Sequence, residues 1–291
     1  MKKRCKFLAV ILSFMAFLGL FTGCKPNNEL TFMSFNIRWP TGEDIGFRGW
    51  NMRKEAVVDL INGSGADVIG LQEISIKKDQ LSYIEEKLKS NYELIYFGEE
   101  VTLATIYDKT VFNLVSQEKY WLSETPDEMS MGWGDTCYRA ACILILEHKA
   151  TGEKVRSINT HGPLVKDGNV KAFELIAERS LSSDNDTFTV MTGDFNARPD
   201  QLGYVPIAEK LQDCRVSAAE SPNRQHNTYN GWGKYPDDKL GERIIDHCFV
   251  SKSADVEVLT YQVRNEKFGE GNYISDHYAV QVAVRMNSWS N

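Results

Sequence analysis

The 291-residue sequence contains no internal repeat, no low-complexity block and no Pro- or Ser-rich linker beyond residue 29. The absence of a linker favours a single domain, although a chain of this length is also long enough for two small ones. Basic residues do not cluster, and 40 acidic residues outnumber 33 basic ones, which gives a formal net charge of −7. This balance argues against a large non-specific nucleic-acid surface, but it leaves open a nucleic-acid substrate held at a small site through a metal ion.

Cysteine is also scarce, and two of the six cysteines lie within the first 24 residues. The other four would allow three complete pairings in an oxidising environment. A bond between Cys137 and Cys142 is disfavoured if both lie on one strand, because five residues of strand span roughly 16 Å. The spacing is poor for zinc as well. We interpret these residues mainly as buried small apolar side chains: Cys137, Cys142, Cys214 and Cys248.

An apolar run long enough to span a membrane is missing. Basic residues within positions 2–6 precede an almost wholly apolar stretch, 7–21, and the small residues Thr22, Gly23 and Cys24. Because the run is short and ends at a cleavage-like site, we predict a secretory signal peptide over 1–23. The Gly-Cys junction resembles a bacterial lipoprotein signal with Cys24 lipidated, although Phe21 departs from the leucine usually found there. Secretion with a free Cys24 is the alternative.

These patterns predict three segments: a signal peptide over 1–23, a tether over 24–29 and one domain over 30–291. We expect the protein to be exported and anchored to a membrane through a lipid on Cys24, at the periplasmic or cell-surface face. We expect it to act as a monomer.

Strand patterns outnumber helical patterns in the domain. Alternating or apolar runs predict strands over 30–36, 67–73, 92–97, 103–107, 111–121, 136–146, 154–161, 187–192, 243–250, 256–263 and 277–284. Helical spacing predicts helices over 53–62, 76–89, 170–181 and near 207–211. Several neighbouring strands are joined by turns too short for a helical crossover. The sequence therefore favours an α+β arrangement, with largely antiparallel sheets packed together and helices on their outer faces.

One stretch, 189–199 (TVMTGDFNARP), combines a strand pattern with candidate chemistry. Its apolar run stops at Gly193 and presents Asp194 and Asn196, whose side chains point the same way if the strand conformation persists. A carboxylate and a carboxamide at a strand end suit a hydrated divalent cation or a phosphate-bound water. An ordinary Asp/Asn turn is the alternative.

The same pattern recurs at other predicted strand ends. Polar residues in such places are costly unless they are paired or metal-bound, so their repeated occurrence points to a site. Two histidines among carboxylates and carboxamides fit metal-assisted hydrolysis. The residues concerned are Asn36, Glu73, His161, Asp194, Asn196, Asp246, Asp276 and His277.

The ordered set SFNIR, LQE, WLSETP, NTH, GDFNARP, IDH and SDH resembles the endonuclease/exonuclease/phosphatase superfamily. That superfamily includes deoxyribonuclease I-like nucleases, neutral sphingomyelinases, inositol polyphosphate 5-phosphatases and deadenylases. The resemblance runs from about residue 30 to residue 285. It implies a four-layer α/β/β/α sandwich with two mainly antiparallel sheets packed face to face. It also implies phosphoester hydrolysis that depends on Mg²⁺, with Mn²⁺ as an alternative.

The resemblance also implies roles for residues. Asn36 and Glu73 match positions that hold Mg²⁺, and Asp276 matches a further acidic position near the metal. Asp194 and Asn196 match the pair that positions the attacking water and contacts the phosphate.

The two histidines match positions with different roles. His277 matches a general base oriented by Asp246, and His161 matches the histidine that donates a hydrogen bond or proton to the phosphoryl group. Arg139 and Tyr107 fall near positions that contact phosphate in some members.

Departures from the family pattern leave the substrate open. Gly162, Pro163 and Leu164 follow His161 where many members have Leu-Asp-His, and Lys171 stands where an arginine is frequent. We favour a nuclease-like phosphodiesterase. The alternatives are a phosphatase or phosphodiesterase acting on sugar phosphates, inositol phosphates or phospholipid headgroups, and a catalytically inactive surface binding module.

Three Gly-Trp pairs lie in predicted loops near strand ends. Their indoles, those of Trp50, Trp133 and Trp232, either line the cleft and stack on substrate or pack against the sheet edges.

Overall fold

The computed structural model describes residues 28–181, 187–235 and 240–289. The predicted signal peptide, Cys24 and most of the predicted tether lie outside the described residues. Within the described ranges, no helix is both long enough and apolar enough to cross a membrane.

Two mixed six-stranded sheets form the centre of the molecule. The first runs in the order β11 (Val256–Arg264), β14 (Ala279–Met286), β1 (Glu29–Asn36), β2 (Val68–Gln72), β4 (Leu103–Asp108) and β3 (Tyr92–Tyr96). The second runs in the order β5 (Phe112–Trp121), β6 (Ala140–His148), β7 (Lys154–His161), β8 (Phe188–Asp194), β10 (Asp246–Ser251) and β9 (Leu211–Asp213). A small hairpin joins β12 (Lys267–Phe268) to β13 (Asn272–Tyr273).

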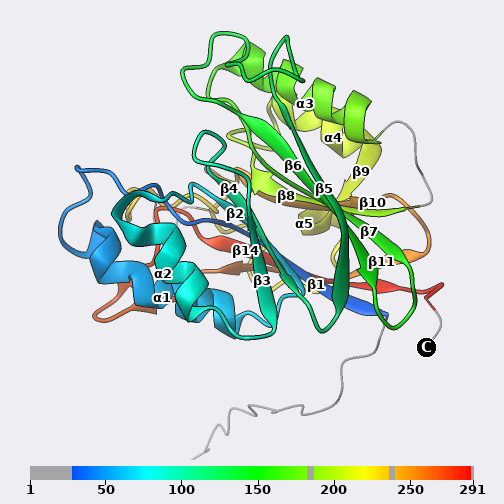
Figure 1. The fold of residues 1–291 in the computed structure, drawn as a ribbon, viewed down its shortest axis with the longest axis horizontal. Coiled ribbons are helices and arrows are strands. Elements are labelled where there is room, and N and C mark those ends of the chain that lie inside the picture. Colours follow the sequence, from blue (N-terminus) through cyan, green and yellow to red (C-terminus); the bar gives the residue numbers. More distant parts are fainter. Residues whose placement is uncertain (1–27, 182–186, 236–239, 290–291) are drawn as a thin grey trace, which may run out of the picture.

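Helices cover the outer faces of both sheets (Figure 1). On the first sheet lie α1 (Trp50–Gly63) and α2 (Gln80–Lys87), and on the second lie α3 (Lys166–Leu181) and α4 (Val205–Lys210). A short helix, α5 (Cys214–Ser217), and 3-10 turns over Gly46–Arg48, Lys77–Asp79 and Leu202–Tyr204 complete the elements. The predicted four-layer sandwich is confirmed. The sequence did not reveal β9, α5 or the β12–β13 hairpin, because runs of two to four residues carry no periodic signal.

Each sheet is built around one parallel pair flanked by antiparallel strands. β1 and β2 are parallel, with Asn36 opposite Gln72, and β7 and β8 are parallel, with His161 opposite Asp194. α1 and α3 connect these pairs, as parallel strands require a crossover. The two sheets therefore share one strand order and one set of directions, a structural repeat that the sequence does not display.

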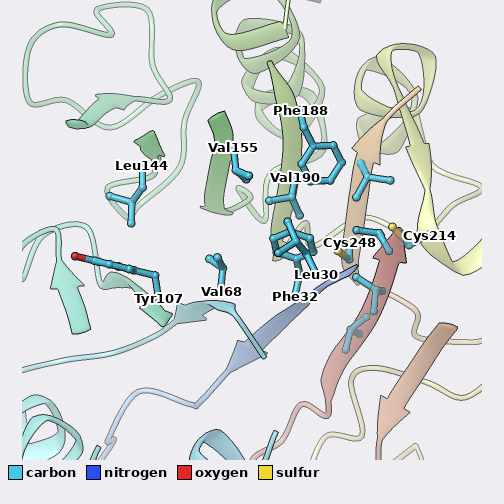
Figure 2. Packing of buried hydrophobic residues seen from close by; sticks show 14 of the residues in the cluster. Leu30, Phe32, Val68, Tyr107, Leu144, Val155, Phe188, Val190, Cys214 and Cys248 are labelled. Carbon is cyan, nitrogen blue, oxygen red and sulfur yellow. The ribbon is translucent and has the colours of Figure 1, made fainter. Parts of the chain in front are cut away.

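The largest hydrophobic cluster fills the space between the two sheets (Figure 2). Phe32 of β1 meets Phe188 of β8 there, with ring centroids 5.9 Å apart. Burying one such side chain contributes about 2 to 3 kcal/mol. Two further clusters pack α1 and α2 on the first sheet and α3 and α4 on the second. The cluster between the sheets fixes them relative to each other, and the two outer clusters hold the helices on them.

The sheets approach most closely beneath the strand ends. A Cβ at Gly70 of β2 would lie 2.3 Å from Oγ1 of Thr192 on β8, so this position requires glycine. Nearby, the buried Asn159 side chain of β7 donates through Nδ2 to the carbonyls of Leu71 (3.1 Å) and Ala104 (2.9 Å). Gln72 Nε2 donates to Asn159 Oδ1 at 2.8 Å. These bonds join β2 and β4 of the first sheet to β7 of the second.

The four cysteines of the domain carry free thiols. Cys142, Cys214 and Cys248 are buried, as predicted, and burial raises the pKa of the Cys142 and Cys214 thiols. Cys137 is exposed, which corrects the interpretation of that residue as a buried apolar side chain. It precedes β6 instead of lying within it.

Candidate active site

Strand direction explains why polar residues distant in sequence meet. The carboxyl ends of the parallel strands β1, β2, β7 and β8 point to one edge of the sandwich, where Asn36, Glu73, His161 and Asp194 lie. The antiparallel strands β10 and β14 begin at that edge and supply three more residues, Asp246, Asp276 and His277. Together they lie in or directly beneath a cleft of about 490 Å³, the main cleft.

The backbone at this edge is unusual at three non-glycine residues. Arg38 (φ 63°), Glu73 (φ 61°) and Asn196 (φ 50°) all adopt the left-handed region. Such a conformation costs on the order of 1 to 3 kcal/mol for a residue with a side chain, and packing around it must compensate. Each residue stands directly after a strand or within two residues of its end. The turn directs the side chains of Glu73 and Asn196 back over the strand ends.

His277 and Asp246 form a buried pair. Nδ1 of His277 lies 3.0 Å from Oδ1 and 2.9 Å from Oδ2 of Asp246. The hydroxyl of Thr228 accepts from the backbone N–H of Asp246 at 2.9 Å and fixes the start of β10. The pairing inferred for these residues is therefore present. It leaves Nε2 of His277 facing Asp194, 3.6 Å from Oδ2.

The pair of His277 and Asp246 also interacts electrostatically with Asp194. Burial lowers the pKa of His277, but the carboxylates of Asp246 and Asp194 outweigh it and raise the pKa to about 10. Burial raises the pKa of Asp194, but His277 and His161 outweigh it, so the pKa lies well below its ordinary value. The two carboxylates thus favour the protonated form of His277, and the two histidines favour the ionised form of Asp194. A general-base role for His277 requires loss of that proton.

His161 approaches the same carboxylate from β7. Its Nε2 lies 3.3 Å from Asp194 Oδ2, while its buried Nδ1 has no hydrogen-bond partner among the described residues. Asn196 donates through Nδ2 to the carbonyl of Gly162 at 3.0 Å, and its backbone N–H donates to Asp194 Oδ1 at 2.9 Å. Asp194 is therefore the central anion, and two histidines and one turn are oriented around it.

The oxygen-rich side of the main cleft holds Glu73, Asn36 and Asp276. Asn36 Nδ2 donates to Glu73 Oε1 and to Asp194 Oδ2, both at 3.1 Å. The backbone N–H of Trp39 donates to Glu73 Oε2 at 2.7 Å. Burial raises the pKa of Asp276, and the Glu73 carboxylate raises it further. Two guanidinium groups act against this rise: that of Arg38, 3.5 Å from Asp276, and that of the buried Arg53.

These residues fit a hard divalent cation. Their donors are carboxylate and carboxamide oxygens, which are the ligands that a hard cation prefers. Glu73 and Asp276 would hold the cation, with Asn36 joining them if its amide turns to present Oδ1, which now accepts from Arg38 N–H at 3.0 Å. A second group of potential ligand atoms lies nearby, where atoms of Asp194, Asp246 and His277 are within 4.8 Å of one another.

Helix α1 supports this edge through one buried cation. The guanidinium of Arg53 donates to the carbonyls of Ile37 (2.5 Å), Arg38 (2.9 Å) and Ile274 (3.3 Å). Burial lowers its pKa to about 10. These bonds tie the segment after β1 to the segment before Asp276, so Arg53 aligns two of the chain segments that carry the site.

The two residues inferred to contact phosphate differ in outcome. Arg139 lines the main cleft, where Asp135 holds its Nε at 3.2 Å. The predicted phosphate contact of Tyr107 is wrong, because its side chain is 3% exposed and belongs to the cluster between the sheets (Figure 2). β4 starts at the cleft edge with Leu103 opposite Gln72, so Tyr107 lies at the far end of that strand, opposite Val68.

Several cleft residues were not identified from the sequence. Arg38 and Arg198 stand inside the quoted SFNIR and GDFNARP stretches, so their positions were available as a signal. Others come from the loop before β10, which carries no periodic pattern. The additional residues lining the cleft include Arg38, Arg198, Arg243, Tyr229 and Tyr235.

The tryptophans of the three Gly-Trp pairs pack against other parts of the protein and do not line the main cleft in the described residues. Trp50 is the first residue of α1 and is buried in the cluster of the first sheet. Trp133 packs against the cluster of the second sheet, and Trp232 contacts Phe47 edge to face at 6.0 Å. The indole beside the site is that of Trp39, which has no neighbouring glycine and so escaped the pattern.

The fold and this edge of polar residues define a class of protein. The Endonuclease/Exonuclease/phosphatase family matches residues 33–277, and the chain belongs to that family. This membership supports phosphoester hydrolysis as the reaction, and the family typically uses a divalent metal.

The chain is also similar to individual proteins. The structure is similar to a mannosyl-6-phosphatase from Bacteroides thetaiotaomicron, with 27% identity, a TM-score of 0.79, and coverage of 88% of this chain and 99% of that one. It also resembles D. rerio TDP2 bound to a single-strand DNA product, with 15% identity, a TM-score of 0.69 and coverage of 88% and 99%. That second likeness shows the fold alone. An uncharacterized protein of Acanthamoeba polyphaga mimivirus is 26% identical over 161 residues, which is 50% of this chain and 59% of that relative's length.

Proposed function

We propose that this protein is a divalent-metal-dependent phosphomonoester hydrolase that uses Mg²⁺ or Mn²⁺. The observation that carries this proposal is that three arginines, Arg139, Arg198 and Arg243, line the same cleft as the acidic residues and the two histidines. Several guanidinium groups in one bounded cleft suit the dianionic terminal phosphate of a monoester, which presents more charge than a diester. The similarity to a mannosyl-6-phosphatase supports the same reaction.

The residues around the phosphate would have different roles in the reaction. A divalent cation, when bound, supplies charge neutralisation on the phosphoryl oxygens. Asp194 and Asn196 orient the attacking water, and deprotonated His277 accepts its proton at Nε2 while Asp246 holds Nδ1. His161 donates through Nε2 to the phosphoryl group. Asp246 thereby fixes the tautomer and stabilises the imidazolium that forms.

The sequence favoured a nuclease-like phosphodiesterase, and this proposal adopts the alternative. A polynucleotide binds through cations distributed along its backbone. Here the arginines gather around one cleft, on a chain whose formal net charge is −7. Export and a lipid on Cys24 are part of the same proposal and are supported by the sequence pattern at residues 1–24. A monomeric state is proposed with them.

The test uses the full chain, purified in detergent, with four substrates in parallel: a hexose 6-phosphate, p-nitrophenyl phosphate, bis-p-nitrophenyl phosphate and supercoiled plasmid. We expect release of phosphate from the monoesters in Mg²⁺, loss of release in EDTA, and a fall of about 10² to 10⁴ in the His277→Ala variant. Plasmid nicking or diester cleavage that exceeds monoester cleavage would restore the nuclease reading. Inactivity on every substrate would support a binding module.

A further inference from the structure

A second compartment opens beside the main cleft. It encloses about 710 Å³ and shares Glu73, Arg139, His161 and Leu164 with the main cleft. Because these shared residues form the boundary, a molecule whose phosphate lies in the main cleft can extend past them without leaving the protein surface. We call this space the side compartment.

The position of the side compartment matches the departing half of a substrate. Phosphoryl transfer places the attacking and leaving oxygens on opposite sides of phosphorus, roughly in line. The pair proposed to activate water, His277 and Asp194, lines the main cleft and not the side compartment in the described residues. Glu73 and His161 line both. Attack from the His277 side therefore expels the leaving oxygen toward Glu73 and the side compartment.

Two aromatic rings line the side compartment, and both are held in place. Trp39 is half-buried, and its backbone N–H donates to Glu73 Oε2 at 2.7 Å. Tyr138 is half-buried, precedes Arg139 and packs against Trp121 with ring centroids 5.6 Å apart. Rigid rings of this kind offer an apolar face to the C–H groups of a ligand at a low entropic cost.

Charge selects which ligand those rings accept. Glu99 and Glu100 line the side compartment, and its single lysine, Lys77, lies 3.8 Å from Glu99 and 4.9 Å from the centre of the Trp39 ring. Lys77 is thus paired with Glu99, and the carboxylate of Glu100 remains exposed. Arg139, at the boundary with the main cleft, is paired with Asp135 at 3.2 Å. Carboxylates repel anionic groups and accept hydrogen bonds from hydroxyls. The side compartment therefore opposes the next phosphate of a nucleic acid and favours an uncharged molecule rich in hydroxyls.

We propose that the side compartment binds the leaving group and that this leaving group is a sugar, so that the substrates are phosphorylated carbohydrates. This inference rests on the proposed phosphomonoester hydrolysis. Trp39 and Tyr138 contact the faces of the sugar ring, and Glu99 and Glu100 accept hydrogen bonds from its hydroxyls. The main cleft holds the phosphate.

The test compares a hexose 6-phosphate with ethyl phosphate, which carries the same charge but no ring or hydroxyls. The full chain and the variants Trp39→Ala, Trp39→Phe, Glu100→Gln and Glu100→Lys are assayed with both. We expect Trp39→Ala to lower the ratio of kcat/KM for the sugar phosphate over ethyl phosphate by about tenfold, mainly through KM, with partial rescue in Trp39→Phe. Glu100→Gln lowers the same ratio, and Glu100→Lys improves KM for a sugar bisphosphate.

Matched controls lie outside the side compartment. Trp133→Ala and Glu118→Gln change the same residue types elsewhere and leave the ratio unaltered. A parent protein that hydrolyses both monoesters, with a ratio that none of the Trp39 or Glu100 variants changes, overturns the side-compartment proposal while the proposed function stands. A parent protein that cleaves plasmid but no monoester overturns the proposed function and, with it, this inference.

Discussion

Asp194 is the anion around which the two histidines of the site are arranged. Its Oδ2 lies 3.3 Å from Nε2 of His161 and 3.6 Å from Nε2 of His277. The side chain stands at the end of β8, two residues before Asn196. The raised pKa of His277 follows from two buried carboxylates that converge from β8 and β10, and no sequence spacing reports such a distance.

The pH dependence of the reaction should follow from that shift. A general base must be deprotonated, so a His277 pKa above its ordinary value moves the rising limb of kcat/KM to the alkaline side of 6.5. The Asp246→Asn variant lacks one of the two carboxylates that raise the His277 pKa. We expect the rising limb of its kcat/KM profile to move to lower pH and its maximal rate to fall. The measurement is kcat/KM for p-nitrophenyl phosphate against pH in constant Mg²⁺. A rate that instead declines as pH rises through this region would show that His277 acts as an acid.

At the scale of elements, strand pairing decided which sequence predictions held. The strands carrying Asn36, Glu73 and His161 were placed correctly because their apolar runs end at those residues. Tyr107 was assigned to the site through the family resemblance, but β4 is antiparallel to β2 and ends at the opposite edge. The direction of a strand depends on its partner, and a single run contains no information about that partner. The residues of the loop before β10 were missed for a related reason, since loops lack a period.

The contact between β2 and β8 gives a stability prediction. Gly70→Ala places a Cβ 2.3 Å from Thr192 Oγ1, so the sheets must separate locally. We expect a loss of about 1 to 3 kcal/mol in the free energy of unfolding, measured by denaturant titration. Gly63→Ala is the matched control, because its Cβ meets nothing within 4 Å. Combining Gly70→Ala with Thr192→Ala should recover part of the loss, and no recovery would place the strain elsewhere.

For the whole molecule, the site links both sheets through charge. Glu73 and Asp276 come from the first sheet and Asp194 from the second, so a divalent cation between them binds the folded chain and not the unfolded one. We expect Mg²⁺ at about 100 times its Kd to stabilise the protein by about 2.7 kcal/mol relative to EDTA. Thermal unfolding at several Mg²⁺ concentrations measures this. The Glu73→Gln variant should be stabilised less by Mg²⁺, whereas the Glu55→Gln variant, changed at an exposed residue, should be stabilised as much as the parent. Equal stabilisation of both variants would show that Glu73 does not hold the cation.

The shared order of the two sheets was beyond the reach of the sequence. Equivalent strands carry different residues, so similarity between the halves exists only in how they pair. The family resemblance was sufficient to predict the four layers because it covers nearly the whole domain. The side chains proposed to determine substrate preference include Arg243 and Trp39, whose surroundings depend on how separate loops meet.

The direction of β1 has a topographical consequence. The strand starts at Glu29, shortly after Cys24, and runs eight residues to Asn36 at the cleft. Eight residues of strand extend about 26 Å, so the chain enters the domain at the end opposite the site. With the proposed lipid on Cys24, the cleft would open away from the membrane that carries the protein. The cleft would then be accessible to molecules from the surrounding medium, and the phospholipids of the anchoring bilayer would lie on the opposite side of the domain.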